Sequence, residues 1–171
     1  VLHNLICSKA VPEVIAENGG VPIRTKVGHS FIKEIMADTG AVFGGEHSAH
    51  YYFRDNYGAD SGLIASMLVL NEISRADTVL SVLRKPFERY SSSGEINTHV
   101  NDPDAVMAHV AEKFSDQQQD WLDGLTVDCG SWWFNLRPSN TEPLLRLNLE
   151  ARTRDDCNQR VAEVLALVTS A

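Results

Sequence analysis

Two polar loops, each flanked by short hydrophobic runs, are the feature that most constrains how this chain can fold. The runs are rich in aromatic and branched residues, so each loop is predicted to connect two β-strands. The loops are residues 44–50 and 137–143, and their flanking runs are residues 41–43, 51–53, 132–134 and 144–147. The sequence therefore predicts strands in both halves of the chain.

Strand and helix patterns alternate through the first half, which is typical of an α/β domain with a mixed sheet. The helix pattern at residues 30–37 has apolar residues at spacings of three and four. Further strands are expected at residues 5–7 and 21–25, and further helices at 11–17 and from Asp60 or Ser61 to about 73. Residues 1–76 are expected to form this domain.

The second half, residues 77–171, predicts a small α+β domain, a sheet with helices on one side. A hairpin is expected around Gly130 and Ser131, and Pro103 suits the first turn of a helix. The expected strands are residues 95–100, 125–129, 132–136 and 144–150. The expected helices are residues 79–83, 102–114 and 155–168. Segments 91–94 and 116–120 are expected to be flexible or irregular connections.

The net charge limits the kinds of molecule that this chain is expected to bind, and the cysteine content indicates its cellular compartment. The net charge of -8 and the pI of about 5.1 argue against nucleic acid or an anionic membrane as partner. Three separated cysteines, Cys7, Cys129 and Cys157, indicate a reduced, cytoplasmic protein. No apolar run approaches the roughly 20 residues of a membrane span, and no signal-peptide pattern is present. Because residue 1 is Val, we expect a fragment of a longer protein or a processed one.

The loop at residues 137–143 has the composition of a phosphate site. Arg137 supplies a planar bidentate donor, and Ser139, Asn140 and Thr141 supply hydroxyl and amide groups within five positions. The same composition is typical of an ordinary turn, because Pro, Ser and Asn are turn formers. Both interpretations remain open on composition alone.

The loop at residues 44–50 has the composition of a sugar site. In a strand-like stretch alternate residues point the same way, so Glu46, Ser48 and His50 are expected to converge on one ligand. The alternative is an ordinary polar connection. A zinc site at His47 and His50 lacks a third ligand nearby, and Ser48 lacks the Gly-x-Ser-x-Gly turn of a hydrolase nucleophile.

His29 follows Gly28 in a loop just before a predicted helix. That position suits contact with an anion or transfer of a proton. The alternative is a solvated histidine with no role.

Together, residues 27–30, 44–50 and 137–143 resemble motifs of the α-D-phosphohexomutase family, and most of all its bacterial phosphomannomutase/phosphoglucomutase members. The order and spacing agree, and the resemblance extends over essentially the whole chain. It implies that residues 1–76 are most of the family's third domain, an α/β layer. It also implies that residues 77–171 are the fourth domain.

The resemblance implies a role for each candidate residue. Glu46 and Ser48 would hold sugar hydroxyls, and His29 and His50 would lie near the transferring phosphoryl group as catalytic acid or base. The phosphate that is not transferred would be bound by Arg137, Ser139, Asn140 and Thr141. The implied reaction moves phosphate between O1 and O6 of a hexose through a phosphoserine and a bisphosphorylated sugar, with Mg²⁺.

Two motifs of the family are absent from this chain. These are the phosphoserine loop, of the Thr-Ala-Ser-His-Asn-Pro kind, and the magnesium loop, of the Asp-Gly-Asp-Gly-Asp-Arg kind, which belong to earlier domains. We therefore expect this chain alone to be inactive, with the missing N-terminal domains as its partner and a hexose phosphate as its ligand. A non-catalytic phosphosugar-binding module is the alternative, and the choice between mannose and glucose phosphate stays open.

Overall fold

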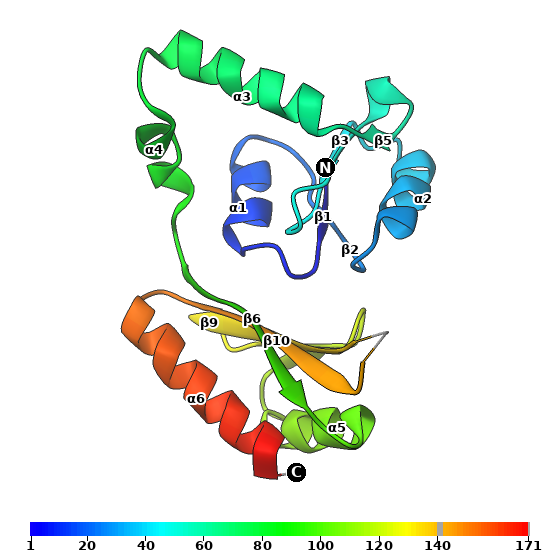
Figure 1. The fold of residues 1–171 in the computed structure, drawn as a ribbon, viewed down its shortest axis with the longest axis vertical. Helices are drawn as coiled ribbons and strands as arrows, with labels where there is room; N and C mark the ends of the chain where they lie inside the picture. Colours follow the sequence, from blue (N-terminus) through cyan, green and yellow to red (C-terminus); the bar gives the residue numbers. More distant parts are fainter. Residues whose placement is uncertain (140–141, 171) are drawn as a thin grey trace. The chain divides into compact units, whose positions relative to one another are not determined.

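The computed structural model describes residues 1–139 and 142–170, and it divides the chain into two compact units (Figure 1). The first unit is Val1–Arg89 and the second is Tyr90–Ala171. The expected division at residue 76 therefore lies too early in the chain. The segment that follows residue 76 still packs within the first unit, because its last residue is bound to a helix of that unit.

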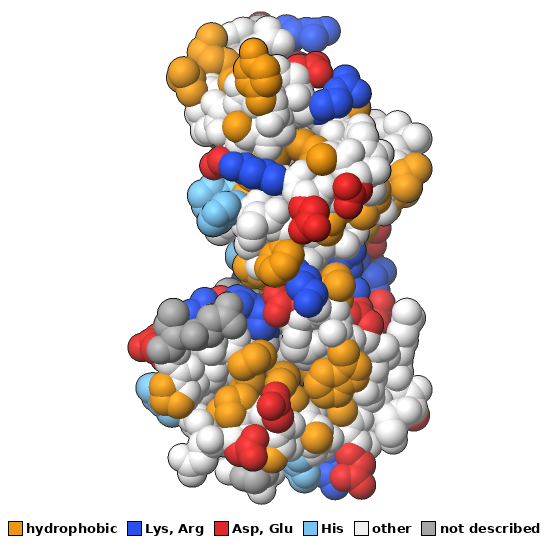
Figure 2. Space-filling view, turned by 90° about the vertical axis from the view of Figure 1, so that its right-hand side faces the viewer, with side chains coloured by type: hydrophobic (Ala, Val, Ile, Leu, Met, Phe, Trp, Pro, Cys, Tyr) orange, Lys and Arg blue, Asp and Glu red, His pale blue; other side chains and the backbone are white. Residues whose placement is uncertain are grey.

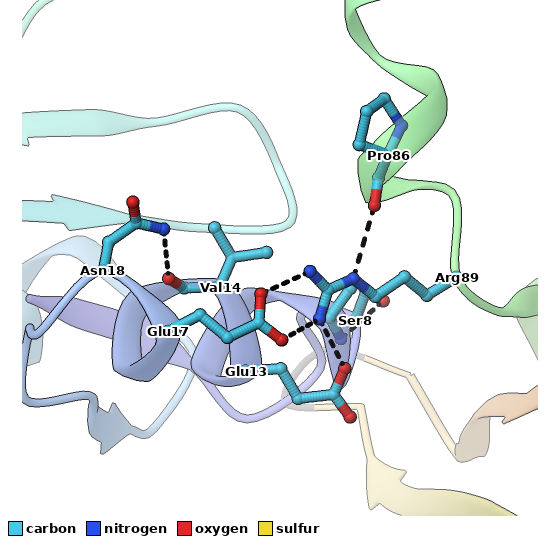
Figure 3. Close-up of polar contacts among 8 residues, drawn as sticks. Ser8, Glu13, Val14, Glu17, Asn18, Pro86 and Arg89 are labelled. Atoms are coloured by element: carbon cyan, nitrogen blue, oxygen red, sulfur yellow. Dashed lines mark hydrogen bonds and ion pairs between the residues drawn. The ribbon is translucent and has the colours of Figure 1, made fainter.

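Arg89 makes this attachment, as Figure 3 shows. Its guanidinium donates two hydrogen bonds of 2.6 Å to the carboxylate of Glu17 and one of 3.1 Å to Glu13, both in helix α1 (Ala10–Glu17). Its Nε also donates to the carbonyl of Pro86, at 3.3 Å. These contacts raise the pKa of Arg89 further above its ordinary value, with the bond to Glu17 as the largest cause.

The first unit contains a mixed five-stranded sheet in the order β2-β1-β3-β4-β5. β1 runs parallel to both β2 and β3, whereas β3, β4 and β5 are joined by antiparallel pairing. The strands are β1 (Leu2–Asn4), β2 (Ile23–Thr25), β3 (Phe43–Gly45), β4 (Tyr51–Phe53) and β5 (Ala59–Asp60). The mixed sheet with helices that the sequence predicts is confirmed.

The helices of this unit differ in how many of their side chains are buried. Helix α2 (His29–Thr39) buries Ile32 and Met36, which contact Leu2, Ala41 and Tyr52 in the core. Helix α3 (Gly62–Ala76) buries no residue, although much of it is apolar. Such exposed hydrophobic side chains appear in orange in Figure 2. The short helical segments are η1 (Arg54–Asn56), α4 (Leu80–Leu83) and η2 (Lys85–Phe87).

The second unit contains an antiparallel sheet in the order β6-β10-β9-β8-β7. Its strands are β6 (Ser91–His99), β7 (Gln118–Asp120), β8 (Leu125–Asp128), β9 (Trp132–Pro138) and β10 (Leu144–Ala151). Helices α5 (Pro103–Lys113) and α6 (Arg154–Ser170) complete the unit. The predicted hairpin around Gly130 is confirmed, as is the α+β class.

One face of this sheet is apolar and the other is polar, because side chains alternate along β9 and β10. On the apolar face, Phe134, Leu136 and Leu147 pack with Val110 of α5 and Val164 of α6. The polar face carries Trp133, Asn135, Arg137, Arg146, Asn148 and Glu150. The helices therefore occupy the apolar side and leave the polar face for other contacts.

Three predicted segments differ in the structure. The first strand is Leu2–Asn4 rather than residues 5–7, and the expected flexible stretch 91–94 is the start of β6. The expected polar connection 116–120 contains the short strand β7. Within the described part of the chain, no helix has the length and apolar character needed to cross a membrane.

Candidate functional site

The loop at residues 44–50 is a tight turn rather than an extended stretch. The Glu46 amide donates to the carbonyl of His50 at 2.9 Å, and the Ala49 amide donates to the carbonyl of Glu46 at 3.0 Å. Ala49 has a φ of 66°, in the left-handed region. The expected alternation is therefore wrong. Glu46 is buried, whereas Ser48 and His50 are exposed.

The Glu46 carboxylate is held by three donors from three parts of the unit. The Tyr52 hydroxyl donates to Oε1 at 2.6 Å, and Oε2 accepts from the Gly28 amide at 3.1 Å and from Asn4 Nδ2 at 3.3 Å. Burial, and secondly the bond to Glu46, raises the pKa of Tyr52. The carboxylate thus links β1, β4 and the start of α2.

His50 is paired with Asp60 in β5. His50 Nδ1 lies 3.1 Å from Asp60 Oδ2, and the hydrogen bond with His50 holds the pKa of Asp60 below its ordinary value. With Asp60 ionised, Nδ1 of His50 is the donor and Nε2 is the ring nitrogen that remains for a ligand. In the sequence Asp60 stands out only as a possible start of a helix, so this pairing is missed.

His29 is exposed and is the first residue of α2. Its neighbour Gly28 is the N-cap of this helix and donates its amide to Glu46. The loop that carries His29 is therefore tied to the loop that carries Glu46, through one buried carboxylate.

No group of three or more His, Cys, Asp or Glu side chains among residues 1–139 and 142–170 is arranged to hold a metal ion. The zinc alternative at His47 and His50 gains no third ligand in this part of the chain. The same residues do not fit the Mg²⁺ that the family resemblance implies, so none of them is assigned to it.

In the second unit, Arg137 of β9 and Arg146 of β10 are direct cross-strand partners. Glu95 of β6 lies 3.5 Å from Arg146 Nη1 and 3.9 Å from Arg137 Nη2. Arg146 Nη2 also donates to the Ser139 hydroxyl, at 3.3 Å. We call Arg137, Arg146 and Ser139 the arginine clamp. Sequence reasoning missed Arg146, because it lies in a leucine-rich strand, outside the polar loop at residues 137–143.

Two donors of the arginine clamp are unused. Arg137 Nε and Arg146 Nε are buried and have no hydrogen-bond partner among the described residues. Asn135 Oδ1 and Asn148 Nδ2 on the same face of the sheet are likewise buried without a partner in the described part of the chain. Buried polar atoms are nearly always partnered, so two unpartnered guanidinium donors on paired strands suit an acceptor with several oxygens. Ser139 is half-buried beside them. Asn140 and Thr141, also expected here, lie outside the described residues.

Comparison with known protein families covers both units. The model for phosphoglucomutase/phosphomannomutase alpha/beta/alpha domain III matches residues 1–90, and the model for the C-terminal domain matches residues 95–167. The chain belongs to the phosphoglucomutase/phosphomannomutase family. The boundary between the two models agrees with the division of the structure after Arg89.

Individual relatives agree with this membership. The chain is 44% identical to a phosphomannomutase of Methanocaldococcus jannaschii over 168 residues, which is 98% of this chain and 37% of that protein. It is 40% identical to a phosphomannomutase of Escherichia coli K12 over 155 residues, 89% of this chain and 34% of that protein. This chain thus spans little more than a third of these relatives.

Solved structures give the same fold. A phosphoglucomutase/phosphomannomutase family protein from Burkholderia thailandensis matches with a TM-score of 0.82 at 26% identity, over 99% of this chain and 37% of that one. A phosphoglucomutase from Paramecium matches with a TM-score of 0.73 at 15% identity, over 98% of this chain and 37% of that one, which shows the fold alone.

Proposed function

We propose that this chain is the C-terminal portion of a hexose-phosphate mutase that interconverts 1-phospho and 6-phospho sugars of mannose, glucose or both. The reaction would proceed through a phosphoserine and a bisphosphorylated sugar. The observation that carries the proposal is the arginine clamp, with two buried guanidinium donors that have no partner among the described residues, in a chain whose two units both match the family. The phosphoserine and the Mg²⁺ site belong to parts of the protein outside this chain.

In this proposal the arginine clamp binds the phosphate that is not transferred. Arg137 and Arg146 supply charge and directed N–H donors, and the Ser139 hydroxyl completes the set. Asn140 and Thr141 are assigned to the same phosphate by their place in the motif. Binding at this remote end supplies energy that positions the reacting end of the sugar.

The loop at residues 44–50 binds sugar hydroxyls. Glu46 has three of its four lone-pair positions occupied, so it accepts one hydroxyl in a fixed direction. Ser48 is exposed on the same loop and contributes a hydroxyl that both donates and accepts. A loop of this kind discriminates by the position of one sugar hydroxyl and tolerates variation elsewhere.

His50 and His29 are assigned to proton transfer at the reacting hydroxyl. Asp60 is hydrogen-bonded to Nδ1 of His50, which orients the ring and leaves Nε2 to face the substrate for proton exchange. His29 stands on the loop that Glu46 ties down, which keeps it close to the sugar loop. His50 is the better supported of the two, because its orientation is set by a carboxylate.

A coupled mutase assay tests the proposal. The 171-residue chain should show no turnover, and a longer protein that includes the upstream phosphoserine and metal loops should be active. Turnover by the chain alone would contradict this division of roles. A longer protein that binds sugar phosphates but never turns over would favour the non-catalytic binding module.

Arg137→Ala in the complete enzyme tests the clamp. It should weaken binding of the substrate phosphate by on the order of 2–4 kcal/mol, because a charge-assisted bidentate contact is lost. Lys113→Ala is the control, since Lys113 is an exposed cation in α5, on the apolar side of the sheet. Substrate affinity equal in the two variants would contradict the assignment.

A further inference from the structure

We infer that Glu95 sets the strength of the arginine clamp: it is an internal counter-ion whose charge opposes the bound phosphate and so favours its release. The inference rests on the proposed function, and it assigns a role to a residue that no motif pointed to. Glu95 acts through the two arginines and is therefore a positioning residue that tunes affinity.

The register of the sheet brings the three charged side chains together. β10 lies between β6 and β9, and Glu95 is paired with Asn148, two residues along β10 from Arg146. From there the Glu95 carboxylate reaches both guanidinium groups, one oxygen toward each. Glu95 thus faces the clamp from the neighbouring strand.

The contacts of Glu95 are electrostatic rather than directional. Charge-assisted N–H···O bonds are about 2.7–2.9 Å long, whereas the two separations here are 3.5 and 3.9 Å. Neither carboxylate oxygen is bonded to the Nε donor of Arg137 or Arg146, and both donors remain without a partner among the described residues. The carboxylate therefore offsets charge without occupying the donors that a phosphate needs.

The balance of charge gives the direction of the effect. Arg137 and Arg146 are like charges directly opposite each other, an arrangement that repels, and Glu95 offsets one of the two. The side chains of Glu95 and Arg146 are 33% and 29% exposed, so the field is only partly screened. A phosphate carries about 1.5–2 negative charges near neutral pH, so it is attracted by the arginines and repelled by Glu95.

A moderate affinity of the arginine clamp for phosphate suits the proposed reaction. The bisphosphorylated sugar must leave the clamp and return with its other phosphate bound there. A clamp of two uncompensated arginines would hold the first phosphate too firmly for this exchange. Glu95 lowers the affinity while leaving the directional donors in place.

The test compares binding of inorganic phosphate to the 171-residue chain and to Glu95→Gln, which keeps the size of the side chain and removes its charge. Titration calorimetry gives the affinity, and the Nε–Hε signals of Arg137 and Arg146 in NMR spectra locate the site. Glu95→Gln should bind phosphate roughly three- to tenfold more tightly at low ionic strength. The difference should shrink in 1 M salt, where the Debye length is about 3 Å.

Glu112→Gln is the matched control, because Glu112 is an exposed acid on α5 and its loss changes the net charge equally. It should alter phosphate affinity less than twofold. Glu95→Thr, which preserves strand propensity, gives a second neutral variant with the same expected direction if Glu95→Gln does not fold.

Unchanged or weaker phosphate binding in both neutral variants, with wild-type binding abolished by Arg137→Ala, would overturn the role of Glu95 and leave the clamp standing. No binding by the wild-type chain, and no response of the Nε–Hε signals, would overturn both the clamp and the role of Glu95. Equal tightening in Glu112→Gln would show a general effect of net charge and would also overturn the inference.

Discussion

The buried carboxylate of Glu46 is held by groups far apart in the sequence. Its donors come from Asn4, Gly28 and Tyr52, and all are needed because an ionised carboxylate without partners is costly to bury. The Glu46 contacts therefore contribute to the stability of the first unit as well as to the shape of the sugar loop.

Tyr52→Phe removes one of these donors and leaves the ring in place. We expect the first unit to lose about 1.5–3 kcal/mol of stability, since the hydrogen bond is to a charged group. Hydrogen exchange at the amides of Gly28 and Ile32 would measure the loss. Tyr51→Phe is the control, because that ring is 37% exposed. Equal exchange rates in both variants would contradict a structural role for the Tyr52 hydroxyl.

The pairing of His50 with Asp60 predicts a pH dependence. Because the pKa of Asp60 is lowered in the folded chain, the stabilisation is present above the ordinary value of about 3.8 and is lost as the pH falls through the folded value. In His50→Gln, the pKa of Asp60 should rise toward that ordinary value. A carbon-detected NMR titration of the carboxyl group would show this, and His47→Gln should leave the titration unchanged.

Residue types predicted part of the candidate site. Hydroxyls and one charged group in a short loop suit a phosphosugar, and this composition points to Glu46, Ser48, Arg137 and Ser139. Arg146, Glu95 and Asp60 could not be found this way, because each acquires its partner through strand register. The signal for Arg146 was a lone cation among Leu145, Leu147 and Leu149.

Among elements, those with strong periodicity or clear capping signals were predicted well. Helices α1, α2 and α5 lie close to their expected ranges, and so do the β8–β9 hairpin and β10. Elements without an apolar pattern were missed. The serines at the start of β6 and the glutamines of β7 form strands because β10 and β8 pair with them, which local composition does not encode.

Removal of the N-capping side chain should have different effects on stability in α5 and in α3. The Asp102 carboxylate accepts from the Ala105 amide at 3.0 Å, and the Ser61 hydroxyl accepts from the Ile64 amide at 3.2 Å. Asp102→Ala should lower the global stability of the second unit by about 1 kcal/mol, because α5 is packed in its core.

Ser61→Ala should instead fray only the start of α3, since that helix buries no residue. Urea unfolding and amide exchange in α3 would separate the two effects. Equal losses of global stability in both variants would contradict the difference in packing.

At the scale of the molecule, each unit has its own core. The larger core lies in the second unit and joins both helices to the sheet, whereas the core of the first unit comprises Leu2, Ile32, Met36, Ala41 and Tyr52. Unfolding is therefore expected in two transitions rather than one, with the first unit the less stable.

Phe134→Ala tests this independence, because Phe134 is fully buried in the second core. It should destabilise the second unit by about 3–5 kcal/mol. All the tryptophans, Trp121, Trp132 and Trp133, lie in that unit, so tryptophan fluorescence reports its transition alone. Protection of the Ile32 amide, in the first unit, from hydrogen exchange should stay constant. Phe87→Ala is the control, because that side chain is 55% exposed, and it should leave the fluorescence transition unchanged.

The position of β1 between β2 and β3 has a consequence for the whole sheet. β1 pairs with β2 on one side and with β3 on the other, and it is the strand through which β2 joins the rest of the sheet. Interruption of this three-residue strand would therefore detach β2 from β3, β4 and β5, so the integrity of the whole sheet depends on one short element.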